Sequence, residues 1–213
     1  MKKILSIILV LLLVLPLLTS CLGKSDGGDV SDSDTGKEST DDGYMKSKKE
    51  VVPASELISL KDAEALLGED LRETSPLGTY FADEASYRGK VFSFKISLIQ
   101  EALYDETEDF DKTVVKDGWS DYVQKMEQVY EKNTAGQNIT KITGIFGTSY
   151  LQEGAGFAQW FLHIFCDDYY IILLIGSIGA MDRVDTEDEI AWKHEKLIEG
   201  GKLAVERLKA IVG

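Results

Sequence analysis

Apolar and polar side chains alternate along residues 91–99, the clearest strand pattern in the chain. The apolar positions are Phe92, Phe94, Ile96 and Leu98, and Ser93, Lys95 and Ser97 stand between them. Because side chains of a strand point alternately to its two faces, this period of two predicts a strand with one buried and one more polar face.

A hairpin is predicted where two apolar runs, residues 160–166 and 169–175, are separated only by Asp167 and Asp168. Both runs are apolar at successive positions, so both faces of each strand must be buried. We therefore expect these two strands at the centre of a sheet, with helices covering each face.

Two further strands are predicted with weaker patterns, at residues 71–81 and 139–150. The second contains Gly144 and Gly147, which indicate bulges or the close approach of another backbone.

Three helices are predicted from caps and from apolar positions three and four residues apart. Ser59 caps the first helix and Gly68 ends it. Ser120 opens the second, and the capping box formed by Thr186 and Glu189 opens the third. One face of this last helix carries Ile190, His194, Leu197, Ile198, Gly201, Ala204, Val205, Leu208 and Ile211. On that face, Gly200-Gly201 indicates either close packing on the sheet or a break in the helix.

The predicted order is therefore helix, two strands, helix, three strands, helix. Short connections imply an α+β fold with a mostly antiparallel central sheet of about five strands, flanked by helices. We expect a single globular domain over residues 51–213.

The N-terminus has a different pattern. Lys2 and Lys3 precede an apolar run, residues 4–18, that ends in Thr19-Ser20-Cys21. This is the layout of a secretory signal. At 15 residues, the run is shorter than the about 17–25 residues that a membrane-spanning helix needs. We therefore expect residues 1–20 to be a cleaved signal peptide.

Leu18-Thr19-Ser20-Cys21 also resembles the lipobox of bacterial lipoproteins. The resemblance implies cleavage between Ser20 and Cys21, acyl chains on Cys21, and anchoring at the extracytoplasmic face of the cell membrane or the outer membrane. After Cys21, residues 22–50 are rich in Gly, Ser and Asp and poor in large apolar side chains. We expect residues 21–50 to form a lipidated, disordered acidic tether.

The domain itself resembles small exported lipoproteins with a Mog1/PsbP-like α/β/α sandwich. The resemblance is carried by four stretches, residues 52–68, 142–150, 162–171 and 203–208. It implies a binding or assembly role and transfers no active-site residue.

Charge excludes one class of partner. The chain has 37 acidic and 23 basic side chains and a net charge of −14. Removal of residues 1–20 would take away two lysines and no acid, which makes the chain more acidic still. Nucleic-acid binding depends on Lys and Arg, so we expect no nucleic-acid partner.

Few residues offer metal or nucleophile chemistry. With two histidines and, beyond the lipidated Cys21, a single cysteine, zinc sites of the usual Cys/His kind cannot be assembled. His163 and Cys166 are three apart on one strand, so they point to opposite faces. We expect His163 to be a core histidine, Cys166 a small buried apolar residue, and His194 a boundary residue.

Other motifs are equally sparse. The acidic run from Asp105 to Asp111 lacks the Gly and Glu of an EF-hand, which leaves a solvated loop or an irregular calcium site. Gly154-Ala155-Gly156 lacks a third glycine and precedes a strand. We assign no catalytic residue, cofactor or metal ligand.

These observations predict a membrane-anchored extracytoplasmic module, not an enzyme, that binds a protein or small ligand through loops or an exposed sheet face. The alternative is an envelope hydrolase with an unrecognised carboxylate or metal site. It would need two or more acids with raised pKa in one pocket.

Overall fold

The computed structural model describes residues 45–76, 78–134, 138–154, 158–179 and 184–213. All of them belong to one compact unit, Asp41–Gly213. The predicted signal peptide, with Ser20 and Cys21, lies outside the described residues. Among the helices that are described, none is both long and apolar enough to cross a membrane.

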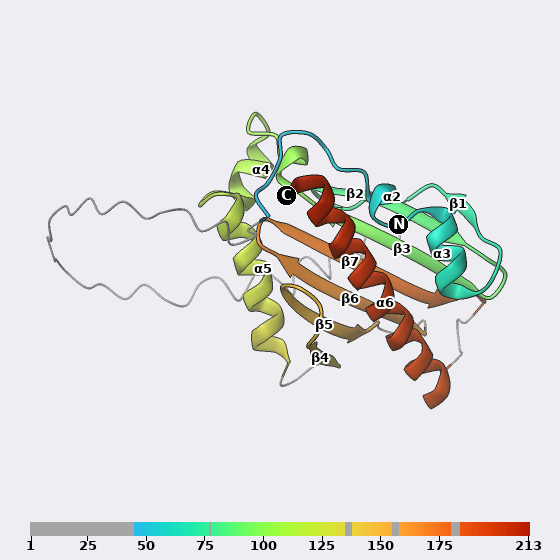
Figure 1. Ribbon diagram of the computed structural model, residues 1–213. Helices are drawn as coiled ribbons and strands as arrows, with labels where there is room; N and C mark the ends of the chain where they lie inside the picture. The colour runs from blue at the N-terminus through green and yellow to red at the C-terminus, as the bar shows by residue number, and fades with distance from the viewer. Residues whose placement is uncertain (1–44, 77, 135–137, 155–157, 180–183) are drawn as a thin grey trace, which may run out of the picture. The chain divides into compact units, whose positions relative to one another are not determined.

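The described residues form seven strands and five α-helices (Figure 1). The strands are β1 (Arg72–Thr74), β2 (Ala82–Arg88), β3 (Phe92–Ile99), β4 (Ile139–Ile142), β5 (Thr148–Glu153), β6 (Gln159–Cys166) and β7 (Tyr169–Ser177). The helices are α2 (Ala54–Leu57), α3 (Leu60–Leu67), α4 (Asp109–Val114), α5 (Trp119–Asn133) and α6 (Glu187–Val212), with a 3-10 turn at Glu101–Leu103. The predicted α+β class is confirmed.

All strands join one antiparallel sheet in the order β1-β2-β3-β7-β6-β5-β4. The hairpin of β6 and β7 lies near its centre and turns at Asp167 and Asp168, as predicted. Asp167 has a φ of 53°, a left-handed conformation that suits an aspartate in a tight turn.

The strand count of about five was wrong, because the sheet has seven. Residues 139–150 form two strands, with Gly144 and Gly147 in the turn between β4 and β5 at φ values of 87° and 81°. The predicted strand at 71–81 is only β1. The sequence of β2 is largely polar, so its pattern did not indicate a strand.

Caps and packing explain the helix bounds. Capping boxes are present at Ser59 with Asp62 and at Thr186 with Glu189. The last helix is unbroken, so Gly200 and Gly201 serve close packing. A Cβ on Gly201 would lie 2.7 Å from Cδ2 of Leu162 on β6.

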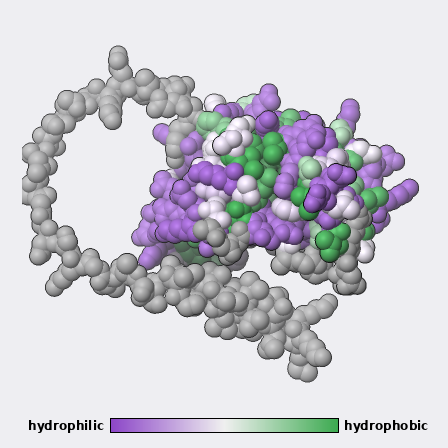
Figure 2. Space-filling model, turned by 90° about the horizontal axis from the view of Figure 1, so that it is seen from below, coloured by the Kyte–Doolittle hydropathy of each residue, from purple (hydrophilic) through white to green (hydrophobic). Residues whose placement is uncertain are grey.

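Two apolar cores lie on the two faces of the sheet. On one face, α2, α3 and α6 pack against the strands, and Phe94, Ile96, Leu162 and Leu173 are fully buried. On the other face, Trp119 and Val123 of α5 pack with residues such as Tyr150, Phe165 and Tyr170. Helices on both faces are therefore confirmed. Figure 2 shows one side of the molecule, where hydrophilic residues predominate and apolar residues form smaller groups between them.

The tether was predicted to extend to residue 50, but residues 45–48 already contact the domain. Met45 is 2% exposed, and its N–H donates to Oδ2 of Asp167 at 2.9 Å. The N–H of Ser47 donates to Oδ2 of Asp168 at 3.0 Å, and that of Lys48 to the Tyr169 hydroxyl at 3.0 Å. Because residues 45–48 bind the β6–β7 hairpin, the described part of the domain includes residues 45–50, which were expected to belong to the tether.

Candidate functional site

The second face of the sheet is covered by α5 at only one end. Residues paired directly across an antiparallel sheet point to the same face, so the register identifies what lies beyond α5. One row runs through Thr74, Ser86, Lys95, Leu174, Phe161 and Gln152. The next row runs through Arg72, Arg88, Ser93, Gly176 and Gln159. We call these two rows the open face.

Burial supports this description. Phe161 and Leu174 are partly exposed although they lie on the two central strands. Neither belongs to either apolar core. Antiparallel sheets can leave one face to solvent, but such a face is ordinarily polar. Here the part on β6 and β7 is apolar, and the part on β1, β2 and β3 is polar.

A buried carboxylate borders the polar part. The side chain of Glu84 on β2 is 1% exposed, and its Oε1 lies 2.5 Å from Nζ of Lys95. The Ser97 hydroxyl donates to the same oxygen at 2.9 Å. Burial alone would raise the pKa of Glu84, but hydrogen bonds from Lys95, Thr79 and Ser97 hold it below its ordinary value. Glu84 is therefore an ionised partner that fixes Lys95, not a general acid.

His163 lies where α5 meets the open face. Its Nδ1 is 2.7 Å from the Tyr170 hydroxyl, and its Nε2 is 3.0 Å from Oε1 of Gln152. The Tyr170 and Tyr130 hydroxyls are 3.2 Å apart. Burial lowers the pKa of His163 to about 3, so the imidazole is neutral with both nitrogens satisfied. The prediction of a core histidine is confirmed.

This histidine makes stability depend on pH. The folded pKa of about 3 lies below the ordinary value of 6.5, so the unfolded chain takes up the proton first as the pH falls. Its contribution is present above pH 6.5 and is lost as the pH falls toward 3. Between pH 7 and 5.5 we expect a loss of about 1 kcal/mol from this group.

Urea unfolding at these two pH values measures the effect, with His163→Phe as the comparison because Phe keeps an aromatic ring without a titrating group. The variant should lose about 1 kcal/mol less than the wild type over this interval. Equal losses in the two proteins would contradict the assignment.

Cys166 and His163 do not meet. Cys166 is fully buried in the core under α6, whereas His163 packs with Tyr130 and Phe161 on the other face. Burial raises the pKa of the Cys166 thiol to about 12, with Asp167 adding to the effect, so no thiolate is available. The predicted structural cysteine on the opposite face is confirmed.

His194 packs edge-on against Trp160, with ring centroids 4.2 Å apart. It is partly buried, as expected of a boundary residue, and burial lowers its pKa. Its Nε2 is buried and has no hydrogen-bond partner in the described part of the chain.

The acidic run from Asp105 to Asp111 is held by internal hydrogen bonds. Oδ1 of Asp105 accepts from the N–H of Thr107 at 2.8 Å, and Oδ2 of Asp111 accepts from the N–H of Asp105 at 3.0 Å. Its end forms α4, which was not predicted. Within the described ranges, no three His, Cys, Asp or Glu side chains are grouped to hold a metal ion. Of the Gly154-Ala155-Gly156 motif, only Gly154 is described, and β6 follows at Gln159, as expected of a motif that precedes a strand.

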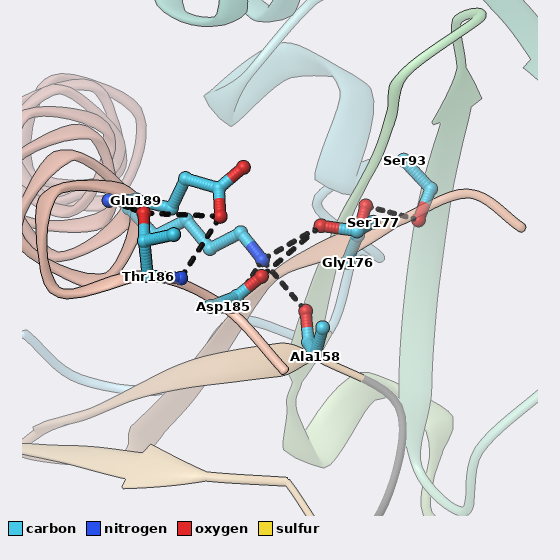
Figure 3. Close-up of polar contacts among 8 residues, drawn as sticks. Ser93, Ala158, Gly176, Ser177, Asp185, Thr186 and Glu189 are labelled. Carbon is cyan, nitrogen blue, oxygen red and sulfur yellow. Dashed lines mark hydrogen bonds and ion pairs between the residues drawn. The ribbon is translucent and has the colours of Figure 1, made fainter. Parts of the chain in front are cut away.

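Sequence reasoning missed Lys193, a fully buried lysine on α6. Its Nζ donates to Oδ2 of Asp185 at 2.6 Å, to Oγ of Ser177 at 2.9 Å and to the carbonyl of Ala158 at 2.7 Å. Figure 3 shows these three acceptors converging at the end of β7, beside the Ser93 contact with Gly176. A lysine that donates all three N–H bonds has no lone pair, so Ser177 and Lys193 are not a nucleophile and base.

A signal for Lys193 did exist. It stands three residues after Ile190 and four before Leu197, which is a core position of the predicted helix. A lysine there requires a buried acceptor. The sequence did not show that Asp185 supplies one.

The direction of the carboxyl pKa shifts does not support the predicted alternative, a hydrolase with a general acid. Four carboxyl groups have a clearly shifted pKa, and in all four the pKa is lowered: Asp62, Glu84, Asp105 and Asp117. A hydrolytic general acid needs a raised pKa.

No protein-family model, curated protein or solved structure matches this chain.

Proposed function

We propose that this chain is a lipid-anchored extracytoplasmic protein that binds a protein or small ligand through the open face. The anchor is supported by the lipobox-like residues that end at Cys21. Two acyl chains hold a protein at a membrane stably, because each buried methylene contributes about 0.8 kcal/mol. The Mog1/PsbP-like group is our proposal for the fold family, supported by helices on both faces of an antiparallel sheet.

One observation carries the binding role: Phe161 and Leu174 stand partly exposed on the central strands, between polar side chains of the same row. Apolar surface rimmed by polar residues marks sites of interaction. The convergence of acids that a hydrolase would need is not seen in the described part of the chain, so the open face supports binding better than hydrolysis.

The test is site-specific photocrosslinking in intact cells. Phe161 is replaced by p-benzoylphenylalanine, which keeps the aromatic ring in place. The matched control carries the same residue at Lys202, which is exposed on α6 on the opposite side of the sheet. We expect adducts from position 161 and none of the same kind from position 202, because only the first faces the proposed partner.

A second arm tests the anchor. With Cys21→Ala, we expect the protein to lose its acyl chains and position 161 to lose its adducts, since the domain is no longer held at the membrane. Equal adducts from positions 161 and 202 would overturn the role of the open face. Acylation that persists in Cys21→Ala would overturn the anchor.

A further inference from the structure

We propose that the β1–β3 end of the open face binds the phosphate group of an organic phosphate whose apolar portion lies on Leu174 and Phe161. This inference rests on the proposed binding role of the open face and names its ligand class. It begins with two arginines: Arg72 on β1 is directly opposite Arg88 on β2.

Fold stability does not explain this pairing. Like charges directly opposite each other across a sheet are destabilising. Arg72 and Arg88 are both exposed, and neither forms an ion pair with any described residue. By contrast, Arg207 is held by Asp62, with Nη2 2.9 Å from Oδ1. In a chain of net charge −14, an unpaired cross-strand arginine pair is a local positive site.

Three hydroxyl-bearing residues and Lys95 lie next to the pair in the sheet. Ser93 is the next residue in the row after Arg88. In the neighbouring row, the Thr74 hydroxyl donates to the Ser86 hydroxyl at 3.1 Å. The Lys95 side chain stands beside Ser86 and keeps 27% of its surface exposed while it binds Glu84.

Two arginines at directly opposed strand positions can bind one phosphate together, whereas their own charges repel each other. Each guanidinium can donate two parallel N–H bonds to phosphate oxygens, and the Ser86 hydroxyl, which accepts from Thr74, has its own proton left to donate. A dianionic phosphate would also remove the repulsion between the two arginines. The charge of the site therefore complements this group.

The row that contains Lys95 also contains the apolar residues that would bind the rest of the ligand. Lys95 is paired with Leu174, and Leu174 with Phe161, so the apolar part of the open face begins one strand from Lys95 and two strands from Arg88. At about 4.8 Å between neighbouring strands, Leu174 lies about 10 Å across the sheet from Arg88, so the ligand needs an apolar portion longer than one phenyl ring, such as a biphenyl group.

The experiment is calorimetric titration of the mature lipidated protein, residues 21–213, in neutral detergent micelles, with inorganic phosphate and with 4-biphenylyl phosphate. We expect both to bind, 4-biphenylyl phosphate several-fold more tightly because its outer ring reaches the apolar part of the open face that begins at Leu174. In Arg72→Gln/Arg88→Gln, the affinity for both should fall by at least about tenfold. The matched control, Lys49→Gln/Lys202→Gln, removes the same charge at exposed positions outside the open face and should bind like the wild type.

Thermal unfolding verifies that the arginine variant is folded. Without phosphate its melting temperature should equal or exceed that of the wild type, because the repulsion is gone. Phosphate should raise the melting temperature of the wild type and not of the variant. Absence of binding at millimolar phosphate, or equal loss in both double variants, would overturn the anion site. Adducts from position 161 would in that case still support binding through the open face. The phosphate site and the binding role of the open face are therefore tested independently.

Discussion

Replacement of Asp185 by asparagine is expected to destabilise the domain by about 3–5 kcal/mol, because it removes a buried carboxylate that binds the buried Lys193 ammonium. The side chains of Lys193 and Asp185 are 0% and 3% exposed. Solvent cannot reach the ammonium, and Ser177 and the Ala158 carbonyl are neutral acceptors that do not replace the charge of the carboxylate. Urea unfolding near neutral pH measures the change.

A double variant separates the charge effect from lost packing. In Asp185→Asn/Lys193→Met, both charges are removed and the helix position becomes apolar, so most of the lost stability should return. Asp117→Asn is the matched control, since it breaks an exposed pair with Lys125 and should cost less than about 1 kcal/mol. A single and a double variant of equal stability would contradict the argument.

The second large effect is expected at Gly147, in the turn between β4 and β5. A Cβ at this position would lie 2.1 Å from the carbonyl oxygen of Phe165, a backbone atom that cannot move aside without disturbing β6. The φ of 81° also disfavours any side chain. Backbone strain and overpacking each contribute about 1–3 kcal/mol, so Gly147→Ala should cost about 3 kcal/mol or more.

Gly144 provides the control within the same turn. Its φ is 87°, but a Cβ there would meet nothing within 4 Å. Gly144→Ala should therefore show the strain alone, about 1 kcal/mol. Equal melting temperatures for the two variants would mean that the close approach to Phe165 does not exist in solution.

Local signals predicted much of this fold. The alternation of apolar and polar residues predicted β3, and two apolar runs predicted the β6–β7 hairpin. Side-chain caps predicted where α3 and α6 begin. These features depend on neighbours within a few residues, which a single sequence displays. The strand β2 was missed because its residues are largely polar, a composition that suits the half-exposed face where Glu84 and Ser86 lie.

The candidate site was less accessible from sequence. The period of a strand was enough to separate His163 from Cys166. The pairing of Arg72 with Arg88 depends on the register of β1 against β2, and no local pattern specified it. The open face is likewise a property of tertiary packing, because it exists only where α5 stops short of Phe161 and Leu174.

The attachment of residues 45–48 has a mechanical consequence. Met45 and Ser47 bind the turn of the central hairpin, and Asp168 of that turn also accepts the indole N–H of Trp119 from α5 at 2.7 Å. A pulling force that arrives along the predicted tether is therefore delivered to the middle of the sheet. It loads the best-buried strands together, and it does not peel an edge strand such as β1 or β4 from its single neighbour.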